Sequence, residues 1–168
     1  MNRNIYNFLK EPTFHKYRIL IDYSTRYCDT FLLVIPDPDW FELSAWDMLS
    51  RLEPFLKEKA ISFEWPGTIL GNGNISKSDN GDNTGTGPIV YKYYLNRETA
   101  EILKNATDGL YGWIQPNLPE DLSLLRPDGT PWLVSITHER DGYLELSTDE
   151  KEQLCEALSE IASILEKA

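Results

Sequence analysis

The residues that could do acid–base or metal chemistry are few, and the densest group is the run 137–141. It places His138, Glu139 and Asp141 at the end of an expected strand and in the turn after it. Alternation along a strand puts His138 and Glu139 on opposite faces, so one metal ion cannot bind both without a bulge. A histidine near a carboxylate can still act as a general base. His138 is therefore the candidate residue of a small-molecule or enzymatic cleft.

Other spacings typical of metal, phosphate or nucleotide binding do not occur in the sequence. The chain has 2 His and 2 Cys, without an HExxH or CxxC pattern. In the glycine-rich stretch 71–87, the run Gly71–Ser76 lacks the consecutive lysine and hydroxyl residue that end a phosphate-binding loop and leads into no expected helix, and Asp79-Asn-Gly-Asp82 departs from the order of a calcium loop. We therefore predict no metal site, no cofactor and no catalytic residues. The stretch 71–87 is interpreted as a flexible loop that could serve as a lid or a contact loop.

The charge balance argues against nucleic acid and membrane partners. The chain carries 16 Lys and Arg against 27 Asp and Glu, a net charge of -11, whereas phosphate contacts require a basic surface. Residues 1–118 carry 15 acidic and 12 basic side chains, and residues 119–168 carry 12 acidic and 4 basic ones. An acidic field of this kind can steer a basic protein partner, although it can also serve solubility alone. The predicted partner contacts are Glu139, Asp141, Glu152, Glu156 and Glu160.

The segment 116–139 resembles a group of bacterial proteins. The resemblance is carried by Pro119-Glu-Asp-Leu122, by Asp128-Gly129, by Trp132 and by the run Ser135–Glu139. The segment is similar to parts of small uncharacterised bacterial proteins, some of which resemble immunity proteins of polymorphic toxin systems. This resemblance implies a bacterial protein that binds a protein partner, and it carries no catalytic motif.

Composition predicts one folded domain over residues 1–168. Hydrophobic residues make up 41% of the chain, charged residues 26% and aromatic residues 12%, as is typical of globular proteins with a substantial core. The longest apolar runs, Phe31–Ile35 and Trp132–Val134, are too short to span a membrane, and the N-terminal residues lack the apolar core of a secretory signal. Cys28 and Cys155 are expected to be free thiols in a reducing compartment, so we expect a cytoplasmic protein.

Local patterns predict an α+β fold with a mostly antiparallel sheet of five or six strands and about three helices. The expected strands are 17–23 and 30–35, which would pair as a hairpin, then 61–65, 88–95 and a three-strand meander of 122–125, 132–138 and 143–146. The first expected helix is capped by Asp39 and broken near Glu53 by Pro54, and the second covers 97–106 and is capped by Asn96. The final helix begins with the capping box of Ser147 and Glu150. Its core-facing residues are Leu154, Leu158, Ile161 and Leu165.

The aromatic residues Tyr91, Tyr93, Tyr94, Tyr111, Trp113 and Trp132 allow two interpretations, a binding surface or the half-buried face of a sheet.

The sequence leaves two main hypotheses for the function. The first is a cytosolic module of the immunity type that covers a basic toxin with its acidic surface. The alternative is a small-molecule-binding protein or enzyme with a cleft near His138, roofed by the loop 71–87; a structural subunit would instead need a large exposed apolar patch.

Overall fold

Ten strands and five α-helices make up the part of the chain that the structure, a computed structural model, describes: residues 2–71 and 87–168. Of the expected flexible loop 71–87, residues 72–86 lie outside this part. The strands are β1 (Asn4–Phe8), β2 (Thr30–Ile35), β3 (Leu56–Ile61), β4 (Glu64–Trp65), β5 (Thr68–Ile69), β6 (Ile89–Tyr94), β7 (Glu120–Leu125), β8 (Pro131–Ile136), β9 (Asp141–Leu146) and β10 (Leu165–Lys167). The helices are α1 (His15–Ser24), α2 (Leu43–Leu52), α3 (Arg97–Ala106), α4 (Thr148–Ala157) and α5 (Ser159–Ala162).

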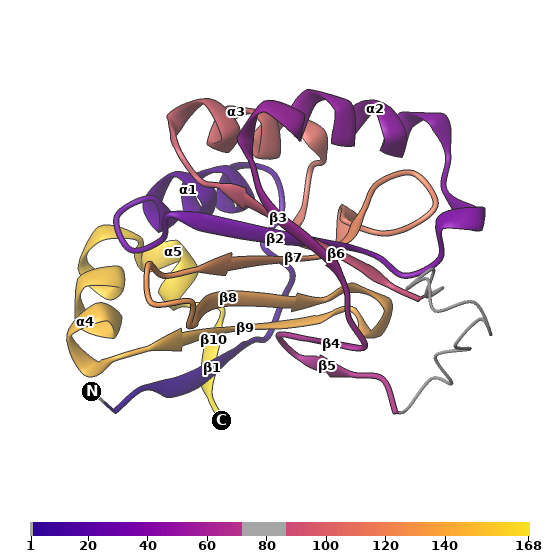
Figure 1. Cartoon of the computed structure of the whole chain (residues 1–168). Coiled ribbons are helices and arrows are strands. Elements are labelled where there is room, and N and C mark those ends of the chain that lie inside the picture. Colours follow the sequence, from indigo (N-terminus) through magenta and orange to yellow (C-terminus); the bar gives the residue numbers. More distant parts are fainter. Residues whose placement is uncertain (1, 72–86) are drawn as a thin grey trace.

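One antiparallel sheet joins eight of these strands in the order β10-β1-β9-β8-β7-β2-β6-β3, and β4 pairs with β5 in a separate hairpin. Figure 1 shows α1, α2 and α3 on one side of the sheet and the β4–β5 hairpin on the other. The α+β class and the antiparallel sheet are thus confirmed. The sheet exceeds the expected five or six strands partly because β1 and β10, from the two ends of the chain, pair with each other and extend the meander.

The segment Tyr17–Tyr23, whose aromatic and β-branched residues predicted a strand, is helical and belongs to α1. The expected hairpin between 17–23 and 30–35 is therefore wrong. The buried side chains of α1 recur at helical spacings of three and four, and the Tyr17 hydroxyl donates a hydrogen bond to the main-chain oxygen of Leu103 in α3 at 2.7 Å. Packing of this helical face against α3 outweighs the strand propensity of the individual residues.

Several predictions that rest on local signals are confirmed, but the helix cap expected at Asp39 is not. The helix α3 covers the expected residues, and the Asn96 side chain caps it by accepting a hydrogen bond from the Thr99 amide at 3.0 Å. The meander forms from β7, β8 and β9. The helix α2 stops before Pro54, as the loss of an amide donor requires, but it begins at Leu43 instead of after Asp39.

The final helix is shorter than its apolar spacing indicated. The capping box is present, with the Glu150 amide 3.2 Å from the Ser147 hydroxyl and the Ser147 amide 2.7 Å from the Glu150 carboxylate. Leu158, however, leaves the helical conformation between α4 and α5. Leu165 lies in β10 opposite Phe8, not on a helix. The last residues leave the helix because they complete the sheet beside β1.

The sheet has an apolar core on each face. The larger core lies between the sheet and the helices, and the smaller one includes Trp65 of the β4–β5 hairpin. Because β2 contributes side chains to both cores, all of its residues are buried. Within the described ranges, no helix is long and apolar enough to cross a membrane. The smaller core consists of Leu32, Val34, Trp65, Val90 and Leu125.

Candidate functional site

A histidine and two carboxylates, from Glu120, Asp121 and His138, meet at one end of the sheet. Glu120 and Asp121 open β7, and His138 lies in a 3-10 helix that joins β8 to β9. One potential ligand atom from each side chain lies within 4.8 Å of the other two. The three residues meet because β7 and β8 are antiparallel neighbours, so the start of one strand lies beside the end of the other.

His138 is not placed by strand alternation as the sequence suggested. The strand predicted over 132–138 ends at Ile136, and the chain turns into the 3-10 helix Thr137–Glu139. His138 Nε2 and a carboxylate oxygen of Glu139 therefore lie 3.8 Å apart instead of on opposite faces of a sheet. The proximity of His138 to the start of β7 depends on this turn.

Asp121 is fully buried, and both of its carboxylate oxygens are held. Oδ1 accepts a hydrogen bond from the Thr137 amide at 2.8 Å, and Oδ2 accepts one from Trp65 Nε1 at 2.9 Å. The backbone of Asp121 is left-handed, with φ of 57°, at a point where the pairing of β2 and β7 changes register. Such a bulge redirects a side chain, and here it turns the carboxylate toward the β8–β9 connection.

Glu120 and His138 are more accessible than Asp121. Glu120 Oε1 accepts a hydrogen bond from the main-chain N–H of Gln115 at 3.2 Å. Burial raises the pKa of Glu120, and the charge of Asp121 raises it further, while the Gln115 amide acts in the opposite direction. The side chain of His138 is 52% exposed. The histidine of the cleft hypothesis thus lies beside carboxylates, but it is not buried among them.

The acidic residues predicted to contact a partner fall into separate groups. Glu139 and Asp141 are exposed at the turn that leads into β9. Glu152 and Glu156 are exposed on α4, which follows the other end of β9, about 17 Å away at the usual rise of a strand. Glu160 lies on α5, with its carboxylate 3.2 Å from His15 Nε2. These residues thus lie in two regions, near the two ends of β9.

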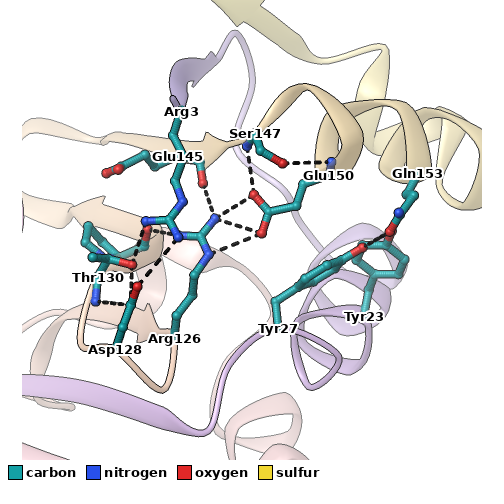
Figure 2. Close-up of polar contacts among 11 residues, drawn as sticks. Arg3, Tyr23, Tyr27, Arg126, Asp128, Thr130, Glu145, Ser147, Glu150 and Gln153 are labelled. Carbon is teal, nitrogen blue, oxygen red and sulfur yellow. Dashed lines mark hydrogen bonds and ion pairs between the residues drawn. The ribbon is translucent and has the colours of Figure 1, made fainter. Parts of the chain in front are cut away.

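Glu150, another acidic residue of α4, has a structural role. Figure 2 shows the Glu150 carboxylate facing the guanidinium of Arg126, the residue after β7. Arg126 Nη2 lies 2.8 Å from Glu150 Oε2, and the same nitrogen donates to the main-chain oxygen of Glu145 at 2.7 Å. Because both side chains of the pair are largely buried, it ties the start of α4 to the β7–β8 turn.

The aromatic residues singled out in the sequence belong mainly to the core. Tyr91 and Tyr93 stack on one face of β6 with ring centroids 6.1 Å apart, as a half-buried sheet requires. Trp113 and Trp132 are fully buried. An aromatic binding surface built from this set is therefore wrong, since among its members only Tyr94 is exposed.

Three large apolar side chains are exposed at the start of α2 and just before it. Trp40 is 60% exposed, Leu43 85% and Trp46 41%. Leu43 and Trp46 are three residues apart and share a face of α2 that the buried stripe of this helix does not include. Phe41 packs edge-on against Trp46, with ring centroids 4.8 Å apart. We call Trp40, Leu43 and Trp46 the tryptophan patch.

Sequence reasoning missed the tryptophan patch, although a signal was present. Ala45, Leu49 and Leu52 define the inward stripe of the helix, so apolar residues off this stripe point outward. Leu43 and Trp46 are such residues. Beside Trp46 the surface is hollowed by about 380 Å³, lined by Trp46, Leu49, Ser50, Glu53, Lys59 and Tyr91.

The segment before α2 is held in place by Gln115, which is only 4% exposed. Gln115 Nε2 donates hydrogen bonds to the main-chain oxygens of Asp37 at 2.8 Å and Trp40 at 2.9 Å. Its Oε1 accepts one from the Asp37 amide at 2.9 Å, and the Glu42 amide donates to the Pro116 oxygen at 2.9 Å. A surface fixed in this way loses little conformational entropy when a partner binds.

Comparisons with protein-family models, with curated proteins and with solved structures gave no match. The described residues offer two candidate sites. One is the tryptophan patch, and the other is the cluster of Glu120, Asp121 and His138.

Proposed function

We propose that this chain is a protein-binding module of the immunity type, which holds a basic protein partner on an acidic surface in the bacterial cytoplasm. The observation that carries the proposal is the exposure of Trp40, Leu43 and Trp46 on a segment fixed by Gln115. Tryptophan is enriched among the residues that dominate the binding energy of interfaces, and exposed apolar patches mark interaction sites.

The charge around the tryptophan patch indicates the chemistry of the partner. Asp37, Asp39, Glu42 and Asp47 are all exposed, and the segment 27–50 contains no lysine or arginine, while Lys59 lines the hollow beside Trp46 together with Glu53. An apolar centre with a charged rim is the usual anatomy of an interface, in which the centre supplies affinity and the rim orients the partner. A partner with basic residues around an apolar contact fits this surface.

The acids predicted from the sequence have a different role in this proposal. Glu139 and Asp141 lie at one end of β9, and Glu152, Glu156 and Glu160 lie on the helices beyond its other end. We assign them to the long-range field of a chain with a net charge of -11. Such a field raises the rate at which a basic partner arrives without contributing direct contacts.

The cytoplasmic location in this proposal is supported by the two cysteines. Cys28 is buried and Cys155 is exposed, and both are free. Free thiols are typical of proteins in reducing compartments.

Photo-crosslinking tests the proposed docking site. A photoreactive amino acid replaces Leu43 in one protein and, as a matched control, replaces Leu9, which is 59% exposed and follows β1. In lysate of the native cell we expect one basic protein to crosslink from position 43 and not from position 9. The yield is expected to fall as the salt concentration rises, because salt screens the attraction between exposed charges.

A second substitution distinguishes specific binding at the patch from non-specific crosslinking. Trp46→Ala in the position-43 protein is expected to lower the crosslink yield, whereas Tyr94→Ala, which removes an exposed aromatic side chain outside the patch, is expected to leave it unchanged. The proposal is overturned if position 43 captures nothing, captures an acidic protein, or captures the same proteins as position 9.

A small-molecule-binding or enzymatic role near His138 is the second candidate function. One observation favours it, the approach of His138 to Glu120 and Asp121 within 4.8 Å. A general base paired with carboxylates needs this proximity. Substitution of His138 by alanine, with loss of any activity found in a substrate screen, would test this role.

A further inference from the structure

The Glu120–Asp121–His138 cluster takes no part in the docking proposed above, and its side chains are of the types that bind metal ions. It offers one imidazole nitrogen and two carboxylates. Carboxylates suit Mg²⁺, Ca²⁺ and Mn²⁺, whereas imidazole suits Zn²⁺ and other transition metals. A mixed set with one histidine therefore favours a divalent transition-metal cation over Mg²⁺ or Ca²⁺.

Within the described residues, no lysine or arginine forms an ion pair with the buried carboxylate of Asp121. The ion pairs found among the described residues involve neither Glu120 nor Asp121. Carboxylates that are buried in proteins are normally paired with a cation, either a basic side chain or a metal ion. Asp121 is fully buried, and Glu120 adds a second carboxylate beside it. A bound cation would supply the missing positive charge.

Thr137 supplies an independent observation at the same place. Its amide holds Asp121 Oδ1, and its side chain is 1% exposed. The Thr137 hydroxyl nevertheless has no hydrogen-bond partner in the described part of the chain. A water molecule or an ion can satisfy a buried polar atom that has no partner in the protein. A water molecule bound to a cation beside Asp121 would satisfy this hydroxyl.

Neighbouring N–H groups already orient the two carboxylates. Trp65 Nε1 and the Thr137 amide hold Asp121, and the Gln115 amide holds Glu120. Each carboxylate oxygen retains a lone pair after accepting one hydrogen bond. Partners that fix the ligands in this way are typical of metal sites, where they raise affinity.

Binding requires the three side chains to close in. Two ligand atoms at tetrahedral angles lie about 3.4 Å apart when each is about 2.1 Å from the ion, against the 4.8 Å that bounds this cluster. His138 is half-exposed and can turn inward to make up the difference. We propose that Glu120, Asp121 and His138 bind a divalent transition-metal cation at this end of the sheet, with water completing its coordination.

Titration with Co²⁺ tests the site, because the visible absorption of the ion reports its coordination. The chain of residues 1–168, freed of metal by a chelator, is expected to bind one equivalent of Co²⁺. His138→Ala and Glu120→Gln are each expected to lower the affinity by at least about tenfold, since even residues that only support ligands contribute that much. Both side chains are partly exposed, so these variants are expected to fold.

His15→Ala is the matched control, because His15 also lies beside a carboxylate, that of Glu160, at 3.2 Å. It removes the other histidine of the chain and is expected to leave Co²⁺ binding unchanged. The same cation should raise the melting temperature of the wild-type protein but not that of His138→Ala. The proposal is overturned if the wild-type protein does not bind Co²⁺, if His138→Ala binds it equally well, or if His15→Ala abolishes binding.

Discussion

Gln115 fixes the main chain of Trp40: its side-chain nitrogen donates a hydrogen bond to the Trp40 oxygen at 2.9 Å from a position that is 4% exposed. The main-chain amide of the same residue donates to Glu120 at 3.2 Å. Gln115 thus joins the tryptophan patch to the carboxylate–histidine cluster. A single buried residue connects the two candidate sites.

Replacement of Gln115 by leucine is expected to weaken both folding and docking. Leucine leaves the main-chain groups of Asp37 and Trp40 without partners, which costs about 1–3 kcal/mol of unfolding free energy for each group left buried. Urea denaturation measures the loss of stability, and the crosslink yield from position 43 measures the docking.

Ser44→Ala provides the comparison for Gln115, since the Ser44 hydroxyl makes an exposed hydrogen bond to the Asn117 oxygen at 2.9 Å. It should change the unfolding free energy by less than about 0.5 kcal/mol. Equal effects of the two substitutions would contradict the role assigned to Gln115.

The ion pair of Arg126 and Glu150 is expected to be important for stability. Glu150→Ala leaves the Arg126 guanidinium buried without its counter-charge, which typically costs about 3–5 kcal/mol. Denaturant unfolding with tryptophan fluorescence is a suitable measurement. We also expect the loss to include the cap of α4, because Glu150 accepts the Ser147 amide.

The exposed pair of Glu58 and Lys92, at 3.4 Å, is the control for the buried one. Glu58→Ala should cost no more than about 1 kcal/mol, because water already solvates both charges. If the two glutamate substitutions destabilise the protein to the same extent, the Arg126–Glu150 pair is not the anchor that we describe.

Association kinetics should separate the acidic field from the tryptophan patch. The partner protein that crosslinks from position 43 is immobilised, and its association with this chain is measured. Substitution of Glu152, Glu156 and Glu160 by lysine is expected to slow association by about tenfold at low salt and to weaken its dependence on salt concentration. Trp46→Ala should instead speed dissociation, because direct contacts act mainly on the off-rate. Surface plasmon resonance at two salt concentrations measures both rates. Unchanged association after the three reversals would rule out steering by α4 and α5.

The two cysteines are expected to differ in reactivity. Burial raises the pKa of the Cys28 thiol, so this residue carries almost no reactive thiolate even at mildly alkaline pH, whereas Cys155 is exposed. Native protein at pH 8 should take up one equivalent of iodoacetamide, and Cys155→Ser should take up none. Cys28 should react only after unfolding in urea. Rapid alkylation of native Cys155→Ser would contradict the burial of Cys28.

How far the sequence predicts the fold depends on the range of the signal. The Asn96 cap, the Ser147–Glu150 capping box and the stop at Pro54 involve residues at most a few positions apart, and all three are confirmed. Tyr17–Tyr23 is different, because its residue types favour a strand and only its packing against α3 makes it a helix. Leu165 is a similar case, since its place in β10 requires β1 from the other end of the chain.

Composition and short-range spacing along the chain were enough to predict the class of the fold, the large acidic charge and many of the local caps and turns. Which distant residues meet depends on how the elements pack. Glu120, Asp121 and His138 come together because neighbouring antiparallel strands place distant positions side by side, and a bulge turns Asp121 toward the β8–β9 connection. The aromatic residues were likewise sorted by burial, with Trp132 inside and Trp40 outside. A side chain's own chemistry does not specify that choice, which depends on the elements that pack over it.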